Sequence, residues 1–288
     1  MEKYGFALYA GRKNRWGNIM YQKWREMYKS KLTTADEAVA MIRDDEVISS
    51  AFGNGQPVRL YEALAKRVLE GKLHKPRIMA ANLVSGMSLL DPEVRDKIEF
   101  DSFFVGDERE RIKEGYFTHS PAKFGDLEMI STQGLRPVQV SVMRVSPMDR
   151  HGFFSTGINV DFGWDMAKSN PHRRLLIVEV NKYVPRTYGN NHLHISEVDV
   201  IIEHDAPLVE VPAPPIKKEW EMIGQYVAEM VPDGATLQLG VGGIPSAVGK
   251  SLLDKRDLAV HTEVIPDIYL ELYKAGVITS SKKTFMPH

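Results

Sequence analysis

The sequence contains no cysteine. This absence excludes disulfides, thiolate nucleophiles and cysteine-ligated metal centres, so any covalent intermediate must form on another side chain. The sequence also has almost no net charge, because 37 Lys and Arg residues stand against 38 Asp and Glu residues. A balance of this kind gives no electrostatic reason to expect nucleic acid or an anionic membrane as a partner.

Long apolar runs are missing as well. No segment stays apolar over the roughly 18 residues that a membrane span needs. Residues 1–15 mix charged and aromatic side chains and lack the apolar core of a secretory signal, which predicts no membrane contact and a cytoplasmic location. The length of 288 residues and the hydrophobic content of 43% suffice for buried cores and, at about 150 residues each, for two domains.

Residues 34–71 predict a helix, a strand, a turn and a second helix. The pattern Thr34-x-x-Glu37 is a capping box, a strand is expected over 47–52, and the glycine turn over 53–57 leads into an amphipathic helix. Alternation of strands with helical segments indicates a mostly parallel sheet covered by helices. The further strands are predicted over 77–83, 98–105, 138–145, 175–180 and 198–203.

Three prolines within residues 211–216 indicate a linker, which separates a first domain, 1–211, from a second, 217–288. The elements predicted after the linker are helices over 219–230, 247–253 and 269–275 and strands over 235–239 and 258–262. Two strands bury little core and leave an open sheet edge, so we expect the second domain to be incomplete or to be completed by another chain.

The most informative pattern lies within residues 236–267. A predicted strand runs into the glycine loop Gly240-Val-Gly-Gly-Ile244 and then into a helix, an arrangement that offers backbone N–H groups to an anion. The next strand delivers Glu263 at its carboxyl end. Gln238 shares a strand face with Gly240, so it either reaches a ligand or is a buried amide bonded to backbone.

Two further stretches strengthen this pattern, Ser146-Pro-Met-Asp-Arg-His-Gly152 with the Phe-Phe-Ser-Thr-Gly that follows, and Asn181-x-x-x-Pro-Arg-Thr-x-Gly189. In this order, and with the glycine loop and Glu263, they resemble the CoA-transferase family that includes 4-hydroxybutyrate, butyrate and succinate CoA-transferases and acetyl-CoA hydrolases. The resemblance extends over nearly the whole chain. It implies an α/β fold of two open, mostly parallel-sheet domains, the second incomplete in this chain.

The resemblance also implies roles for individual residues. Glu263 corresponds to the family's nucleophile. Phe52 stands where several relatives place a histidine, which points to a less polar acid, and Ser246 stands where an Asp or Asn is common and is expected to act as a helix cap. The residues implied at the CoA thioester are Gly240, Val241, Gly242, Gly243, Ile244 and Gln238, and those implied on the substrate side are Phe52, Gly53, Asn54 and Gly55.

Simpler interpretations accompany each motif. A glutamate after a strand is ordinarily a solvated surface residue, and a glycine turn often only packs a strand against a helix. Ser146, Asp149 and His151 contain the atoms of a hydrolytic triad but are too close in sequence, and a tight turn explains them better. We predict no metal site, because no carboxylate at a recognised ligand spacing accompanies the histidines at 192, 194 and 204.

The predicted activity is transfer of CoA between an acyl-CoA and a small carboxylic acid through a glutamyl-CoA thioester. Coenzyme A is then a substrate, and no permanently bound cofactor is expected. Two alternatives stay open, an acyl-CoA hydrolase and a truncated or split chain that does not turn over by itself. The expected partners are acyl-CoA and a small carboxylate, together with further copies of the chain or the missing C-terminal part, and no nucleic acid or membrane.

Overall fold

A computed structural model describes residues 19–79, 88–104, 109–210 and 215–286. The chain divides into two compact units, Met1–Val209 and Glu210–His288. No helix in the described ranges is long and apolar enough to cross a membrane.

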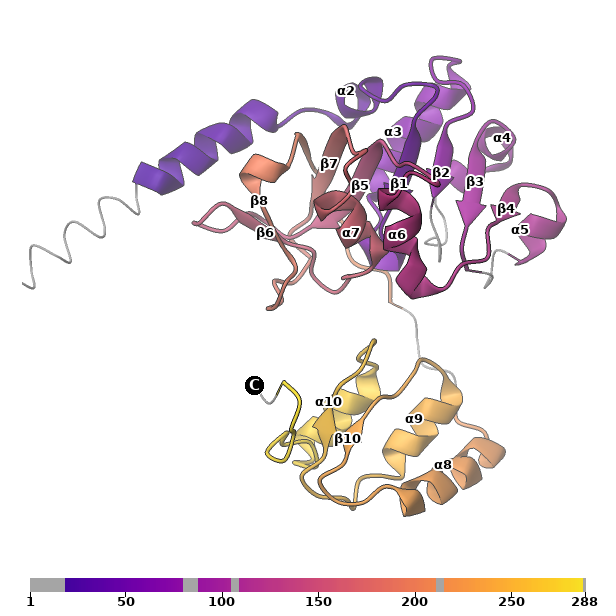
Figure 1. Ribbon diagram of the computed structural model, residues 1–288, viewed down its shortest axis with the longest axis vertical. Coiled ribbons are helices and arrows are strands. Elements are labelled where there is room, and N and C mark those ends of the chain that lie inside the picture. Colours follow the sequence, from indigo (N-terminus) through magenta and orange to yellow (C-terminus); the bar gives the residue numbers. More distant parts are fainter. Residues whose placement is uncertain (1–18, 80–87, 105–108, 211–214, 287–288) are drawn as a thin grey trace, which may run out of the picture. The chain divides into compact units, whose positions relative to one another are not determined.

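Seven parallel strands form the sheet of the first unit, in the order β4-β3-β2-β1-β5-β7-β9 (Figure 1). The chain starts at β1 in the middle, builds outward to β4, and returns to build the other half from β5. Ligands of open α/β sheets bind where this order reverses, outside the carboxyl ends of β1 and β5. The strands are β1 (Val47–Ser50), β2 (Arg77–Met79), β3 (Glu99–Ser102), β4 (Phe117–His119), β5 (Val140–Val145), β7 (Leu175–Val180) and β9 (Val200–Glu203).

Helices cover both faces of this sheet. Helices α2 (Ala35–Ala40) and α3 (Val58–Leu69) pack on the face that carries Ile48 and Ile78. Helices α6 (Leu127–Thr132) and α7 (Phe162–Lys168) lie on the opposite face, and the indigo helix of residues 19–31 extends from the sheet (Figure 1). The short helices α4 (Pro92–Arg95) and α5 (Arg109–Lys113) flank β3 and β4.

The predicted order of elements over residues 34–71 is confirmed. Thr34 and Glu37 form a capping box at the start of α2, and the predicted apolar positions of α3 are buried. The expected parallel sheet is also present, although the sequence did not predict β4. A small antiparallel pair, β6 (Phe153–Ser155) with β8 (His192–His194), was missed too; three-residue strands are too short to show a period.

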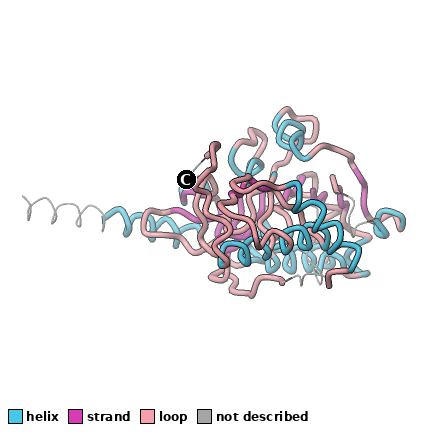
Figure 2. The backbone as a smooth tube through the Cα atoms, turned by 90° about the horizontal axis from the view of Figure 1, so that it is seen from below, coloured by secondary structure: helices cyan, strands magenta, loops and turns pink. Residues whose placement is uncertain are grey.

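The second unit contains α8 (Lys218–Met230), β10 (Thr236–Leu237), α9 (Gly243–Lys250), β11 (Ala259–Val260) and α10 (Asp267–Lys274). Strands β10 and β11 pair in parallel, and the three helices surround a separate core. Figure 2 distinguishes the helices, strands and connecting loops of the chain by colour. The sequence placed the start of α9 at Ala247, which is wrong by four residues: Gly243 and Ile244 belong to the helix, not to the loop before it.

Candidate active site

The glycine loop and Glu263 follow the neighbouring strands β10 and β11. The parallel register pairs Thr236 with Ala259 and Leu237 with Val260, and the backbone N–H of His261 still donates to the carbonyl of Leu237 at 3.0 Å. Gly240 follows β10 by three residues, and Glu263 follows β11 by three residues. The two segments therefore leave the same edge of a sheet at its carboxyl ends, where parallel sheets place their reacting groups.

Unpaired backbone donors gather at the start of α9. Gly242 is the N-cap residue, at φ 129°, and provides no side-chain cap. Within the described part of the chain, the N–H groups of residues 241–244 have no hydrogen-bond acceptor, and Pro245 has no N–H to offer. An uncapped helix N-terminus of this kind carries partial positive charge and is suited to a developing oxyanion.

The sequence suggested that Ser246 caps the helix, and this expectation is wrong. The helix begins three residues before Ser246, whose hydroxyl donates to the carbonyl of Gly242 at 2.9 Å. Ser246 therefore stabilises the first turn of α9 through its bond to the carbonyl of Gly242. The capping position belongs to Gly242 because only glycine readily adopts that positive φ.

The glycines of the loop differ in what surrounds them. A Cβ added at Gly243 would lie 1.9 Å from a ring carbon of Trp220 on α8. A Cβ at Gly240 would meet only Pro245, at 4.0 Å. Gly243 is therefore required for packing α9 against α8, whereas the backbone at Gly240 has open space beside it.

Glu263 and Gln238 are both exposed in the second unit. Glu263 has no ion pair or hydrogen bond within the described residues, so its carboxylate is not committed to a structural partner. The interpretation of Gln238 as a buried amide is wrong. Its neighbour along the strand, Leu239, is the buried residue instead.

The predicted substrate-side residues lie in the first unit, at the carboxyl end of β1. The ring of Phe52 packs against Phe124 and Phe162 at centroid distances of 5.7 and 5.0 Å. Its backbone N–H donates to a carboxylate oxygen of Asp161 at 2.9 Å, and the other oxygen of Asp161 caps α7. The Phe52 turn is thus fixed at the reversal point of the sheet. Burial raises the pKa of Asp161, and the two backbone donors oppose that rise.

Asn54 and Gly55 have structural partners. The side-chain amide of Asn54 donates to the carbonyl of Val209 at 2.9 Å and accepts from its N–H at 2.8 Å. A Cβ at Gly55 would lie 2.7 Å from that of Ala51. Gly53, at φ 45°, has open space around it. The structure therefore keeps these four residues as one group in the first unit and the glycine loop with Glu263 as another in the second.

A buried ion pair, which the sequence did not predict, lies at the first turn of α3. Glu179 on β7 accepts the N–H groups of Arg59 and Leu60, at 2.9 and 3.2 Å, in the first turn of α3. Arg144 on β5 donates to Glu179 at 3.3 Å, and both side chains are buried. Burial raises the pKa of Glu179, while the Arg144 guanidinium and the helix N–H groups oppose the rise. The positions of Arg144 and Glu179 within otherwise apolar strand sequences could have indicated this pair.

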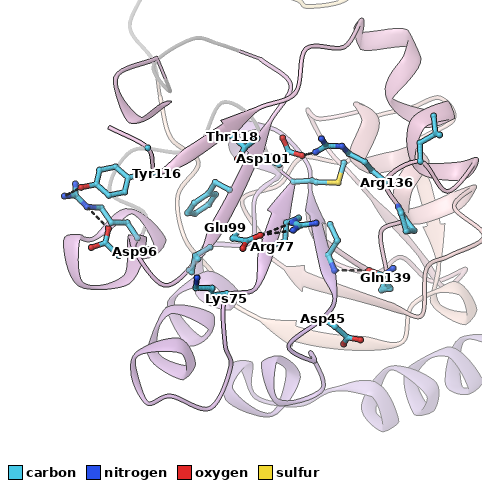
Figure 3. Close-up of a pocket in the computed structure, with 18 residues that line it drawn as sticks. Asp45, Lys75, Arg77, Asp96, Glu99, Asp101, Tyr116, Thr118, Arg136 and Gln139 are labelled. Atoms are coloured by element: carbon cyan, nitrogen blue, oxygen red, sulfur yellow. Dashed lines mark hydrogen bonds and ion pairs between the residues drawn. The ribbon is translucent and has the colours of Figure 1, made fainter. Parts of the chain in front are cut away.

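A hollow of about 810 Å³ opens on the sheet face beside β1 to β4 (Figure 3). Arg77 and Glu99 form an ion pair across it at 2.9 Å, and Arg136 pairs with the buried Asp101. None of the predicted site residues lines this hollow. Arg77 and Glu99 begin their strands, so this part lies toward the amino ends, away from the edge that carries the functional loops.

The turn around Asp149 is confirmed. A carboxylate oxygen of Asp149 accepts the N–H groups of His151 and Phe153 at 2.8 and 2.9 Å. The ring of His194 packs against that of Trp24 at 4.5 Å. Among the described residues, no group of three or more metal-ligating side chains is assembled.

Comparison with known proteins identifies the family of the chain. Residues 16–212 match the family model described as the acetyl-CoA hydrolase/transferase N-terminal domain. The chain belongs to this family.

The similarity to individual acetyl-CoA hydrolase/transferase family members extends into the second unit. The chain is 35% identical over 271 residues to the 4-hydroxybutyrate coenzyme A transferase of Clostridium kluyveri, covering 92% of this chain and 61% of that protein. It is 33% identical to the butyryl-CoA:acetate CoA-transferase of Anaerostipes caccae, covering 90% and 59%. The chain thus spans about three fifths of the length of these relatives.

Solved structures show the same fold over most of the chain. RipA from Yersinia pestis superposes with a TM-score of 0.83 at 35% identity, over 91% of this chain and 62% of that one. The 4-hydroxybutyrate CoA-transferase of Porphyromonas gingivalis gives a TM-score of 0.78 at 30% identity, over 92% and 62%.

Proposed function

We propose that the protein transfers CoA between an acyl-CoA and a small carboxylic acid, with Glu263 as the nucleophile. One observation carries the proposal: two directly paired parallel strands are followed by a helix N-terminus and by a carboxylate, and neither the N–H groups of residues 241–244 nor the carboxylate of Glu263 has a partner among the described residues. Family membership and the names of the relatives support the same chemistry.

The reaction begins when the Glu263 carboxylate attacks the thioester carbonyl. The carbon–sulfur bond breaks, leaving a mixed acyl–glutamyl anhydride and the CoA thiolate. The thiolate then attacks the glutamyl carbonyl and releases the first carboxylate, which gives a glutamyl-CoA thioester. A second carboxylate attacks this thioester, and the released thiolate takes up the new acyl group and restores Glu263.

Each addition passes through an oxyanion that the glycine loop is suited to stabilise. Gly242 is the N-cap residue of α9 and residues 243 and 244 lie in its first turn, so the helix holds the N–H groups of these residues in place before the substrate arrives. Preorganised donors of this kind contribute about 3 kcal/mol each to lowering the barrier. Val241 is 80% exposed at the tip of the loop, where it can contact the bound thioester from outside.

The turn at Phe52 is proposed to contribute to the acid site. Phe52 is partly exposed and stands in an aromatic cluster with Phe124 and Phe162. An apolar wall favours an acid with a short hydrocarbon chain over one with a polar chain. We therefore expect butyrate to be preferred over 4-hydroxybutyrate as the acceptor.

Covalent trapping tests the mechanism. After incubation with butyryl-CoA and treatment with borohydride or hydroxylamine, mass spectrometry should place the modification on the peptide that contains residues 261–267. Because the chain has no cysteine, a thioester to CoA must involve a carboxylate. The variant Glu263→Ala should form no adduct, and Glu263→Asp, which withdraws the carboxylate by more than about 1 Å, should react at least about 100-fold more slowly.

Glu219→Gln, an exposed glutamate of α8, is the matched control and should behave as wild type. An adduct on any other peptide, or normal labelling of Glu263→Ala, would contradict the mechanism. Exchange of labelled butyrate into butyryl-CoA separates the transferase from a hydrolase, which releases free CoA without incorporating the label.

A further inference from the structure

Tyr269 is hydrogen-bonded to the backbone directly before the glycine loop. It is the third residue of α10, and only 4% of its surface is exposed. Its hydroxyl oxygen accepts the backbone N–H of Leu239 at 2.8 Å. Leu239 is the residue directly before Gly240, so the phenol is bonded to the backbone at the point where the strand becomes the loop.

Thr262, the neighbour of Glu263, also contacts Leu239. The hydroxyl of Thr262 lies 2.8 Å from the carbonyl of Val264 and 3.4 Å from the carbonyl of Leu239. Both backbone polar groups of Leu239 are therefore approached by side chains from the segment that carries Glu263 and from the helix that follows it.

These contacts begin where the strand ladder ends. Strands β10 and β11 contain two residues each, and their last backbone bond joins His261 to Leu237. Beyond that point no backbone bond fixes the loop to the Glu263 segment within the described residues. Catalysis by a carboxylate and an N–H donor group requires their separation to be held to a fraction of an ångström.

We propose that Tyr269 is a positioning residue that keeps the glycine loop and the Glu263 segment in register for reaction. The inference rests on the proposed function of Glu263 and adds a residue that does not touch the substrate. Burial raises the pKa of the Tyr269 hydroxyl, although hydrogen bonding with Thr262 and Leu239 opposes the rise. The group therefore stays protonated near neutral pH and acts through its hydrogen bonds.

The test compares Tyr269→Phe with Tyr273→Phe. Both substitutions remove one phenolic oxygen from α10, one helical turn apart, but Tyr273 is 67% exposed. Single-turnover formation of the adduct on the 261–267 peptide is measured for both variants with saturating butyryl-CoA. Tyr269→Phe should lower the rate constant about tenfold, equivalent to about 1.4 kcal/mol, with the final amount of adduct unchanged, and Tyr273→Phe should match wild type.

The rate constant distinguishes positioning from stability. A purely structural role would reduce the folded fraction, and hence the amount of adduct, without slowing the molecules that react. Amide hydrogen exchange at Leu239, measured by NMR, gives a readout that needs no turnover and should be about tenfold faster in Tyr269→Phe.

The outcomes separate the two proposals. If wild type forms the adduct and Tyr269→Phe reacts at the rate of Tyr273→Phe, the positioning role is wrong and the proposed function stands. Unchanged exchange at Leu239 also overturns the positioning role. If wild type forms no adduct at Glu263, the proposed function fails and the catalytic role of Tyr269 fails with it.

Discussion

Single side chains divide the glycine loop into a packed half and an open half. Trp220 fills the space beside Gly243, whereas only Pro245 lies near Gly240. The motif in the sequence treats these glycines alike, and their surroundings assign them different functions. Substitutions at the two positions should therefore affect different properties of the protein.

We expect Gly240→Ala to keep the fold and to slow transfer, because the new methyl group occupies space that the thioester needs. Gly243→Ala should instead destabilise the second unit by about 1–3 kcal/mol, since its methyl group overlaps the Trp220 ring. Calorimetry and adduct formation measure the two effects. Gly125→Ala, at a position with open space and ordinary φ, is the control. A stable, inactive Gly243→Ala protein would contradict this assignment.

Connections between elements are fixed by charged side chains as well as by apolar packing. Glu46, in the turn between α2 and β1, is 5% exposed. It accepts the backbone N–H of Arg43 at 3.0 Å and a guanidinium N–H of Arg174, just before β7, at 2.6 Å. Burial alone would raise the pKa of Glu46, but the Arg174 guanidinium and the Arg43 N–H hold it below the usual value.

This depressed pKa predicts acid sensitivity of the first unit. A carboxyl group whose pKa is lower in the folded state contributes stability above its unfolded pKa, here 4.5, and loses that contribution as pH falls through the folded value. Urea unfolding should show Glu46→Gln to be less stable than wild type at pH 7, and the difference should shrink below about pH 4. A difference that is constant with pH would show that the charge of Glu46 is not what matters.

Short elements explain most disagreements between prediction and fold. The helices that carry a full apolar face, such as α3, were predicted within a residue or two of their observed bounds. The missed strands β4, β6 and β8 have three residues each, and their pairing depends on neighbours far away in the sequence. The start of α9 was misplaced because Pro245 and Ser246 resemble a loop, whereas proline is tolerated in the first turn of a helix.

The molecule as a whole has two unequal hydrophobic cores. In the first unit, several buried clusters line both faces of the seven-stranded sheet. The second unit has one smaller cluster, built around Leu252, Leu258 and Leu272. Burial of apolar surface is the main source of folding free energy, so the second unit should be the less stable one.

Differential scanning calorimetry should therefore resolve two transitions, the second unit melting first. Leu252→Ala, at a fully buried position, should cost about 2–5 kcal/mol and lower only the earlier transition. Leu64→Ala in the first unit should lower only the later one. A single transition that shifts with both variants would mean that the two units unfold cooperatively.

Residue order alone determined the chemistry that can be proposed here, together with the family and the class of fold. The glycine loop, Glu263 after the next predicted strand and the absence of cysteine are local facts of the chain, and amphipathic spacing is local as well. Only the tertiary structure decided that Gly243 packs against Trp220, that Glu179 and Arg144 pair behind α3, and that the Tyr269 phenol bonds to Leu239. These contacts join residues 23 to 35 positions apart or lie between separate elements, and no periodic pattern encodes such distances, because they arise only when the elements pack.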